Sequence, residues 1–349
     1  MPDISRIDKN FAVGGSIERE GCVFYSAEES PFRLSGVFRE NGRLRRMPEE
    51  VAKTVSTGVA YLHTNNAGGR VRFKTDSPYI AISAHVDNIA RSCDFPLSGA
   101  AGFDMYVDGV FTKSFPPTYD VVDRLEGIFD FTDGRKMREI CINFPLYSGV
   151  LEVFIGLDGK ACVEAPTPYI NDKPIVYYGS SITQGGCASR PGMSYQAIVS
   201  RHFNCDYINL GFSGNARAEE PMYNYINGLD MSVFVYDYDH NADTSMDLEA
   251  THERMFLAIR EKHPDLPVVI MQRPKFYLNH DEKMRGRVLR QTYQNALNRG
   301  DKNVYFISNR ELCALCGNEG TVDGCHPTDF GFMSMARAVI ELFESENIL

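Results

Sequence analysis

The first half of the chain is a series of short apolar or alternating runs separated by turn residues. Such runs are typical of strands with one buried face. They predict strands over 71–74, 79–85, 103–107, 110–115, 139–144 and 149–155. Turn sequences such as Asn66-Ala67-Gly68-Gly69 and Asp108-Gly109 stand between them. The pattern predicts a jelly-roll-like, all-β sandwich domain over 1–168, with one or two helical turns at 48–57.

The second half has a different sequence pattern, in which short apolar runs alternate with helical patterns. Ala165-Pro166-Thr167-Pro168 precedes it and is predicted to be a stiff linker, because each proline fixes φ and disfavours helix. Strands are predicted over 174–179, 206–211, 232–238, 266–272 and 303–308, and helices over 193–203, 246–263, 281–298 and 328–343. This alternation predicts an α/β domain over 169–349, with a parallel sheet flanked by helices.

Composition narrows the function classes. The 349 residues favour two domains, and the net charge of −10 argues against binding to nucleic acid or to an anionic membrane. We therefore expect Arg43, Arg45 and Arg46 to be a solvated surface cluster. The absence of tryptophan excludes a sugar platform built on indole rings, although tyrosine could replace it.

The segment MPDISRIDKNF has no apolar core, and no apolar run is long enough to span a bilayer, so a cytoplasmic location is expected. Nine scattered cysteines do not form a disulfide framework. Cys313 and Cys316 form one CxxC pair, for which free thiols are favoured over a zinc site. We predict no metal and no cofactor, and the sequence does not indicate an oligomeric state.

Two segments carry candidate chemistry for nucleophilic catalysis. Ser180 and Ser181 follow the first strand of the second half, between glycines, where a serine on a tight turn can act as a nucleophile. Asp323 and His326, three residues apart, could supply a base and the carboxylate that orients it. Taken alone, each segment also fits an ordinary loop.

Two further segments could stabilise an oxyanion. Asn209-Leu210-Gly211-Phe212-Ser213-Gly214 follows the second strand, and a glycine there lets a backbone N–H approach a substrate closely. Asn241 follows the third strand, and its side-chain amide can donate.

The order of these four segments resembles the SGNH (GDSL-type) hydrolase family of esterases and lipases. The resemblance implies that Ser181 is the nucleophile, His326 the general base and Asp323 its orienting carboxylate. It also implies an oxyanion hole made by the Ser181 backbone N–H, Gly214 and Asn241.

This sequence departs from the family pattern in two places. Ser180 stands where the family usually has aspartate, which leaves Ser180 as an alternative nucleophile, and Asp239-His240-Asn241-Ala242 replaces the usual Gly-x-Asn-Asp. Gly102-Phe103-Asp104-Met105-Tyr106 is similar to the Gly-x-Asp-Leu-Tyr motif in the N-terminal β-domain of a bacterial SGNH subgroup. The resemblance therefore extends across both halves.

The subgroup resembles carbohydrate esterases, which implies hydrolysis of small acyl esters, acetyl esters above all, of a small-molecule or oligosaccharide substrate. An acyltransferase using the same acyl-serine and a non-catalytic carbohydrate-binding protein are the alternatives. Four side chains are candidates for substrate binding: Gln184, Arg190, His240 and Arg273. For Arg190 a structural salt bridge, and for His240 a role within its loop, are the competing interpretations.

Overall fold

The N-terminal region forms two antiparallel sheets around one hydrophobic core. The computed structural model describes residue 7 and residues 17–349. One sheet has the strand order β1 (Cys22–Ser26), β11 (Gly149–Asp158), β6 (Tyr79–Asp87), β9 (Arg124–Asp130). The other has the order β12 (Val163–Glu164), β5 (Arg70–Thr75), β10 (Arg138–Asn143), β7 (Phe103–Val107), β8 (Val110–Phe115), with β2 (Arg33–Ser35) paired to β5.

Alternation explains why these segments are strands. Along β6 the side chains of Ile80, Ile82, Ala84 and Val86 are all buried in the core that the two sheets share. Successive side chains of a strand point to opposite faces, so residues two apart share one face. The six predicted strands of this half are all present, whereas β1, β2, β9, β12 and the small hairpin of β3 (Phe38–Glu40) and β4 (Arg43–Arg45) were not predicted.

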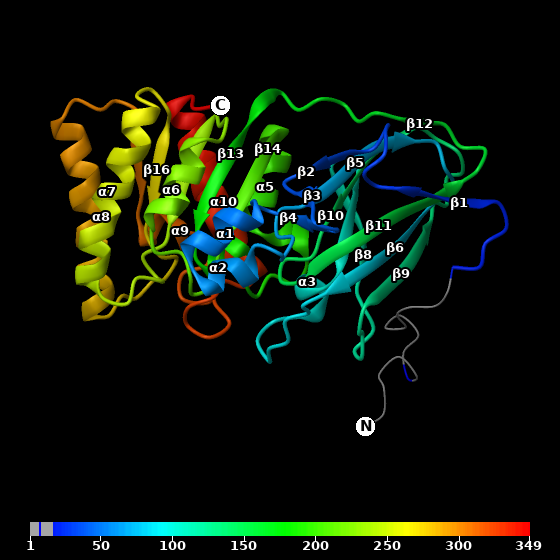
Figure 1. Cartoon of the computed structure of the whole chain (residues 1–349), viewed down its shortest axis with the longest axis horizontal. Helices are drawn as coiled ribbons and strands as arrows, with labels where there is room; N and C mark the ends of the chain where they lie inside the picture. Colours follow the sequence, from blue (N-terminus) through cyan, green and yellow to red (C-terminus); the bar gives the residue numbers. More distant parts are fainter. Residues whose placement is uncertain (1–6, 8–16) are drawn as a thin grey trace.

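The second half contains a five-stranded parallel sheet with helices on both faces (Figure 1). The strand order is β14 (Cys205–Gly211), β13 (Asn171–Gly179), β15 (Val233–Asp237), β16 (Val268–Met271), β17 (Val304–Ile307). The helices are α4 (Ser181–Gln184), α5 (Tyr195–Phe203), α6 (Glu220–Asn227), α7 (Ser245–Lys262), α8 (His280–Asn298), α9 (Asn309–Leu312) and α10 (Asp329–Glu346). The predicted α/β class is confirmed, and all nine predicted elements appear with small shifts at their ends. The predicted helix at 193–203 begins at Tyr195, after a 3₁₀ turn at Pro191–Met193.

The central strand β13 shows how the sheet is buried on both faces. Ile175 and Tyr177 belong to the core under α5 and α10, whereas Val176 and Tyr178 belong to the core under α6, α7 and α8. A continuous apolar run is the expected pattern for such a strand. The carboxyl end of β13 therefore leads directly from the buried sheet into the loop that carries Ser180 and Ser181.

Two N-terminal helices pack on the parallel-sheet half rather than on the strands that surround them in sequence. They are α1 (Glu49–Val55) and α2 (Thr57–Leu62), which lie beside α6 in Figure 1. Met47, Ala52 and Val59 are fully buried in the same core as α6 and α7. The N-terminal segment thus contributes part of the packing around the parallel-sheet half.

The expected solvated arginine cluster is wrong for two of its three members. Arg45 and Arg46 are buried, and Arg46 donates hydrogen bonds to the carbonyls of Gly211 (2.7 Å) and Leu62 (2.8 Å). Burial lowers the pKa of Arg46 to about 9. Arg46 therefore joins the N-terminal segment to the carboxyl end of β14, which an acidic overall composition could not reveal.

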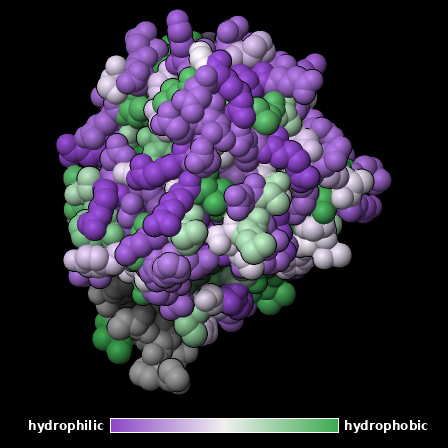
Figure 2. All heavy atoms as spheres, turned by 90° about the vertical axis from the view of Figure 1, so that its left-hand side faces the viewer, coloured by the Kyte–Doolittle hydropathy of each residue, from purple (hydrophilic) through white to green (hydrophobic). Residues whose placement is uncertain are grey.

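The face that carries α7 and α8 is mainly hydrophilic, with small, separate apolar patches (Figure 2). Its exposed apolar side chains include Met246, Leu257 and Leu297, which lie on these two helices. Isolated exposed apolar residues are normal on a globular surface. Within the described residues, no helix is both long and apolar enough to cross a membrane.

Candidate active site

The loop that carries the predicted nucleophile, residues 180–185 and here called the nucleophile loop, turns sharply from β13 into α4. Ser180 is fully buried and accepts a hydrogen bond from the Ile182 backbone N–H at 3.2 Å, so it caps the helix. Ser181 is the first helical residue, where a backbone N–H has no partner within the helix. The alternative of Ser180 as nucleophile is therefore wrong, because its hydroxyl faces the helix backbone.

Ser181, His326 and Asp323 form a continuous hydrogen-bond chain. Ser181 Oγ lies 2.9 Å from His326 Nε2, and His326 Nδ1 lies 2.7 Å from Asp323 Oδ2. When Nδ1–H donates to the carboxylate, Nε2 is free to accept the serine proton. This arrangement can activate a serine hydroxyl for attack on an ester carbonyl.

The loop of Asp323 is held by its own backbone. Asp323 Oδ1 accepts from the backbone N–H groups of His326 at 2.7 Å and Cys325 at 2.8 Å. Partial burial raises the pKa of Asp323, but these hydrogen bonds and the one from the His326 ring outweigh it and bring the pKa below its ordinary value. The carboxylate is therefore ionised at neutral pH, as a group that stabilises an imidazolium must be.

The three candidate oxyanion donors come from three adjacent strand ends. Gly214 follows β14 and adopts a positive φ of 69°, a conformation that glycine tolerates best. Asn241 follows β15, and its side-chain amide donates to the carbonyl of Phe212 at 2.9 Å. That contact ties the Asn241 loop to the Gly214 loop, and the second hydrogen of the amide is left for a substrate oxygen.

A buried carboxyl supports the nucleophile loop from behind. Asp237, at the end of β15, accepts from the Thr183 hydroxyl and from the Ser180 backbone N–H. Burial raises the pKa of Asp237 to about 8, although the hydrogen bond from Thr183 acts in the opposite direction. Position 179 accepts only glycine, because a Cβ there would collide with the Asp237 carboxyl and the Thr183 hydroxyl.

The N-terminal half also holds the nucleophile loop, which sequence reasoning did not anticipate. The Tyr147 hydroxyl donates to the Ser181 carbonyl at 3.1 Å. The Gln184 amide donates to Asn65 Oδ1 at 3.1 Å and to the Leu146 carbonyl at 3.2 Å. Loops that are distant in sequence supply these contacts, and no local pattern marks them.

Gln184 is therefore a scaffold residue rather than a substrate contact. Its side chain has no exposed surface, and its Oε1 accepts from the Ser213 backbone N–H at 3.0 Å. Every bond that the amide makes is to the protein, which corrects the prediction that it binds substrate. The residue joins the nucleophile loop to the Gly214 loop and to two loops of the N-terminal half.

Arg190 pairs with the Gly-x-Asp-x-Tyr motif of the N-terminal half. It lies 2.8 Å from Asp104 Oδ2 and 2.6 Å from the Tyr106 hydroxyl, and Asp104 Oδ2 also accepts from the Gly192 backbone N–H at 2.8 Å. Asp104 is fully buried, so this charge pair is internal. The salt-bridge interpretation of Arg190 holds, and a substrate-binding role is not supported.

Two family models match consecutive parts of the chain. Residues 172–344 match the GDSL-like lipase/acylhydrolase family, and residues 22–163 match the GxDLY N-terminus of SGNH-hydrolase-type esterases. The chain belongs to the GDSL-like lipase/acylhydrolase family. The sequence resemblance is thus confirmed for both halves. A search of proteins with curated descriptions found no matching sequence.

Solved structures share the whole architecture. A Bacteroides ovatus protein described as GDSL-like lipase is 28% identical, with a TM-score of 0.82 over 93% of this chain and 98% of its own. The salicylyl-acyltransferase of a tetracycline biosynthetic pathway is 20% identical (TM-score 0.78; 95% and 99%). An acetyl xylan esterase from the rumen bacterium Butyrivibrio proteoclasticus is 11% identical (TM-score 0.57; 93% and 98%).

The second departure from the GDSL-type pattern forms a buried polar cluster behind the triad. His240 Nδ1 lies 3.7 Å from the sulfur of Cys325, and its Nε2 lies 3.5 Å from Asp239 Oδ1. Arg273 pairs with Glu282 at 2.8 Å and lies 3.6 Å from Asp239 Oδ2. Burial, together with the charge of Arg273, lowers the pKa of His240 well below its ordinary value, so the imidazole is neutral.

Arg273 is therefore committed to internal carboxylates and is nine-tenths buried, which leaves little surface for a substrate. His240 lies next to the residue that precedes His326, and its contact with a substrate stays a prediction.

The cysteines of the CxxC pair are both buried. Across residues 17–349 no group of three or more His, Cys, Asp or Glu side chains could hold a metal ion.

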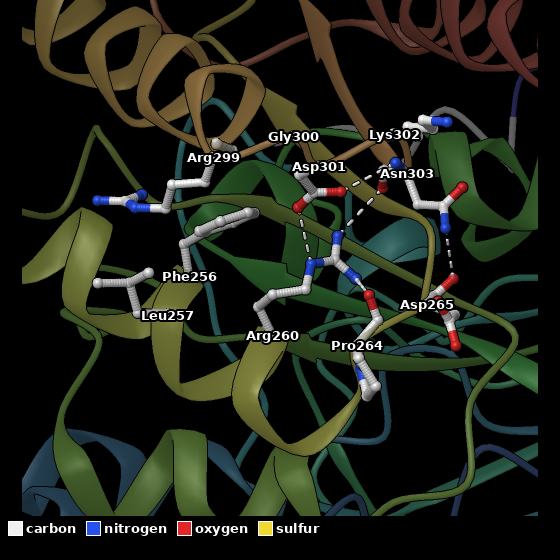
Figure 3. A pocket seen from close by; sticks show the side chains of 11 residues that line it. Phe256, Leu257, Arg260, Pro264, Asp265, Arg299, Gly300, Asp301, Lys302 and Asn303 are labelled. Atoms are coloured by element: carbon white, nitrogen blue, oxygen red, sulfur yellow. Dashed lines mark hydrogen bonds and ion pairs between the residues drawn. The ribbon is translucent and has the colours of Figure 1, made fainter.

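A hollow of about 420 Å³ lies at the opposite edge of the sheet, between the ends of α7 and α8 (Figure 3). Arg260 crosses it and donates to Asp301 at 2.8 Å, to the Leu266 carbonyl at 2.6 Å and to the Asn303 carbonyl at 3.2 Å. These bonds join the loops before β16 and β17. Arg260 therefore acts in this hollow as a structural clamp.

Proposed function

We propose that this protein is a serine esterase that hydrolyses small acyl esters, acetyl esters of carbohydrates first among them, through an acyl-serine intermediate. The observation that carries the proposal is the chain from Ser181 Oγ through the His326 imidazole to Asp323, with contacts of 2.9 and 2.7 Å. Membership in the GDSL-like lipase/acylhydrolase family agrees with ester chemistry.

In the first half of the proposed reaction, His326 Nε2 takes the hydroxyl proton as Ser181 Oγ attacks the ester carbonyl carbon. Negative charge then develops on the carbonyl oxygen. The Ser181 and Gly214 backbone N–H groups and the Asn241 amide are the donors that hold this oxyanion. His326 next protonates the leaving alcohol oxygen, and the C–O bond breaks to leave the acyl-serine.

In the second half, His326 removes a proton from water, which attacks the acyl-serine carbonyl. The same donors hold the second oxyanion, and the proton returns to Ser181 as the carboxylic acid leaves. Asp323 stays ionised throughout and stabilises the imidazolium in both halves. The side chains of His326 and Asp323 are 30% and 34% exposed, so water reaches the base directly.

The fold similarity to an acetyl xylan esterase is the reason to test acetylated sugars first. Because the chain has no tryptophan, tyrosine, phenylalanine or polar side chains must hold a sugar ring. The cytoplasmic location stays a prediction, and it would place the hydrolysis after uptake of the ester.

An acyltransferase is the second candidate, and the fold similarity to a salicylyl-acyltransferase favours it. Such an enzyme forms the same acyl-serine and passes the acyl group to another alcohol in place of water. Product analysis with a sugar alcohol present separates the two, because only transfer yields a new ester.

The proposal is tested with wild type and Ser181→Ala side by side, against p-nitrophenyl acetate and a panel of acetylated mono- and oligosaccharides. We expect acetate release by wild type and a loss of at least 10³-fold in the variant. Equal rates in both proteins contradict the assignment of Ser181. Sugar binding without any ester turnover favours the non-catalytic carbohydrate-binding alternative.

A further inference from the structure

A second polar cavity lies between the N-terminal sheets and the parallel-sheet half. Its volume is about 120 Å³, and its walls come from β5, β10, α5, β14 and the connection before β13. Arg70, Arg72 and Arg201 line it together with Tyr106, Tyr169 and Tyr207. Tyr207 lies near the amino end of β14, whereas Ser181 follows the carboxyl end of β13, so the cavity and the triad occupy opposite edges of the sheet.

Two of the three arginines already have counter-charges. Arg70 pairs with Asp206 and donates to the Tyr169 hydroxyl at 2.9 Å. Arg72 donates to the Thr167 carbonyl at 2.7 Å and lies 3.3 Å from Glu139. These bonds join the connecting segment and β14 to β5, so they account for the structural role of both side chains.

Arg201 differs from them. Its guanidinium lies over the ring of Tyr106, with Cζ 4.1 Å from the ring centroid. Among the described residues, its Nη1 is buried without a hydrogen-bond partner. Arg201 as a whole is half-buried, but its Nη1 is buried, and a buried N–H without an acceptor is costly because it has lost its water without gaining a hydrogen bond.

The cavity has an excess of positive charge in addition to the unpaired Nη1 of Arg201. Two carboxylates, Asp206 and Glu139, face three guanidinium groups, which leaves an excess of one positive charge. Burial raises the pKa of the Cys141 thiol in the cavity wall, and the charges of Arg70 and Arg72 act in the opposite direction. A guanidinium edge is suited to bidentate contact with carboxylate or phosphate oxygens.

We propose that this cavity binds a small oxyanion, a carboxylate or a phosphate-type anion, with Arg201 as its principal donor. The anion supplies the acceptor that Arg201 lacks and balances the excess charge. Because the walls come from both halves of the chain, its binding also stabilises the contact between them. The site is separate from the proposed ester chemistry and does not depend on it.

The direct test is calorimetric titration of the full chain with phosphate, sulfate or acetate, in a zwitterionic buffer with sodium chloride at matched ionic strength. We expect saturable one-site binding of at least one of the three anions, and their ranking decides between the phosphate and carboxylate classes. Arg201→Gln is expected to weaken that binding at least tenfold. Arg337→Gln, which removes an exposed arginine paired with Glu341 on α10, is expected to leave it unchanged.

Ser181→Ala is also expected to bind the anion as wild type does, because the triad lies at the other edge of the sheet. Loss of ester turnover therefore leaves this inference standing. The absence of saturable binding of all three anions to wild type contradicts it, as does equal affinity in Arg201→Gln.

A second readout needs no variant. Cys141 lines the cavity, whereas Cys93 is exposed elsewhere on the surface. We expect a saturating concentration of the bound anion to slow alkylation of Cys141 at least threefold and to leave Cys93 unchanged, as followed by peptide mass spectrometry. An unchanged rate at Cys141 places the anion outside the cavity and overturns the inference.

Discussion

The two loops that meet at the hydrogen bond between Ser181 and His326 are built in opposite ways. The nucleophile loop is buried, since Ser180, Thr183 and Gln184 have no exposed surface. It is held from outside by Asp237 of the sheet and by Asn65 of the N-terminal half. The nucleophile loop is thus fixed by tertiary contacts that reach across the whole molecule.

The base loop, residues 321–327, is held mainly by itself. Asp323 accepts from backbone N–H groups two and three residues further on, and the Val322 backbone N–H donates to the His326 carbonyl at 2.9 Å. The side chains of His326 and Asp323 are about one-third exposed. Substitutions in the base loop should therefore affect turnover alone, whereas those around the nucleophile loop should also affect folding.

The largest expected effect is in the base loop. His326→Gln removes the proton acceptor, so we expect ester hydrolysis to fall on the order of 10⁴-fold or more. The free energy of unfolding should change by less than about 0.5 kcal/mol, because the ring is about one-third exposed. Both are measured by steady-state kinetics and urea denaturation.

The matched control is His202→Gln, which changes a histidine paired with Glu344 on the surface and should leave both quantities unaltered. A His326→Gln protein with more than a tenth of the wild-type rate is incompatible with the assigned base.

Next in size is the effect of Asn241→Ala. The change removes one oxyanion donor, which in such sites lowers kcat by about 10²–10³-fold. KM should change little, because the donor acts on charge that develops in the transition state. Asn298→Ala, at the exposed end of α8, serves as the control. A loss smaller than tenfold would mean that the Asn241 amide serves only its contact with the Phe212 carbonyl.

Asp237→Asn tests the support of the nucleophile loop through pH. The pKa of Asp237 is about 8 in the folded protein and 3.8 in an unperturbed chain. Between these values the folded state keeps a proton that the unfolded state releases, so wild-type stability falls as the pH rises from about 4 to 8.

Asparagine imitates the protonated carboxyl and does not titrate, so the variant should lose this pH dependence of stability. The difference in free energy of unfolding between variant and wild type should therefore be about 1–3 kcal/mol more favourable to the variant at pH 8 than at pH 5. Denaturation with urea at both pH values measures it. Parallel pH profiles for the variant, wild type and the exposed Asp230→Asn control would show that Asp237 does not titrate in this range.

The last prediction concerns stability alone and is made for Gln184→Ala. The change deletes three buried hydrogen bonds and leaves their partners unpaired, which should lower the free energy of unfolding by about 1–3 kcal/mol. Gln294→Ala, whose side chain bonds only to exposed Asn298, is the surface control. An unfolding midpoint equal to that of wild type would remove Gln184 from the contacts that hold the two halves together.

The same contrast explains how much of the site could be predicted from the sequence. Ser181, Gly214 and Asn241 follow successive strands, and in a parallel sheet the carboxyl ends of strands lie at one edge, so linear order indicated their meeting. Asp323 and His326 are close in sequence and hold each other through local bonds. Both kinds of information are present in short segments of the chain.

The remaining contacts depend on tertiary packing that no local pattern encodes. Tyr147 reaches Ser181 from a loop of the N-terminal half, and Arg46 is buried against β14 although it follows Arg45 in an acidic chain. The nearness of Gln184 to Ser181 in sequence predicts a contact with the substrate. Its burial shows that nearness to a catalytic residue does not by itself indicate exposure to the substrate.

Covalent labelling shows whether Ser181 is an activated nucleophile. The folded protein is treated with a fluorophosphonate, which reacts with a serine hydroxyl activated by a neighbouring base. Peptide mass spectrometry then locates the adduct. The account predicts a single adduct on Ser181, absent in Ser181→Ala and strongly slowed in His326→Gln, whereas an adduct on another serine, or none in the folded wild type, would contradict it.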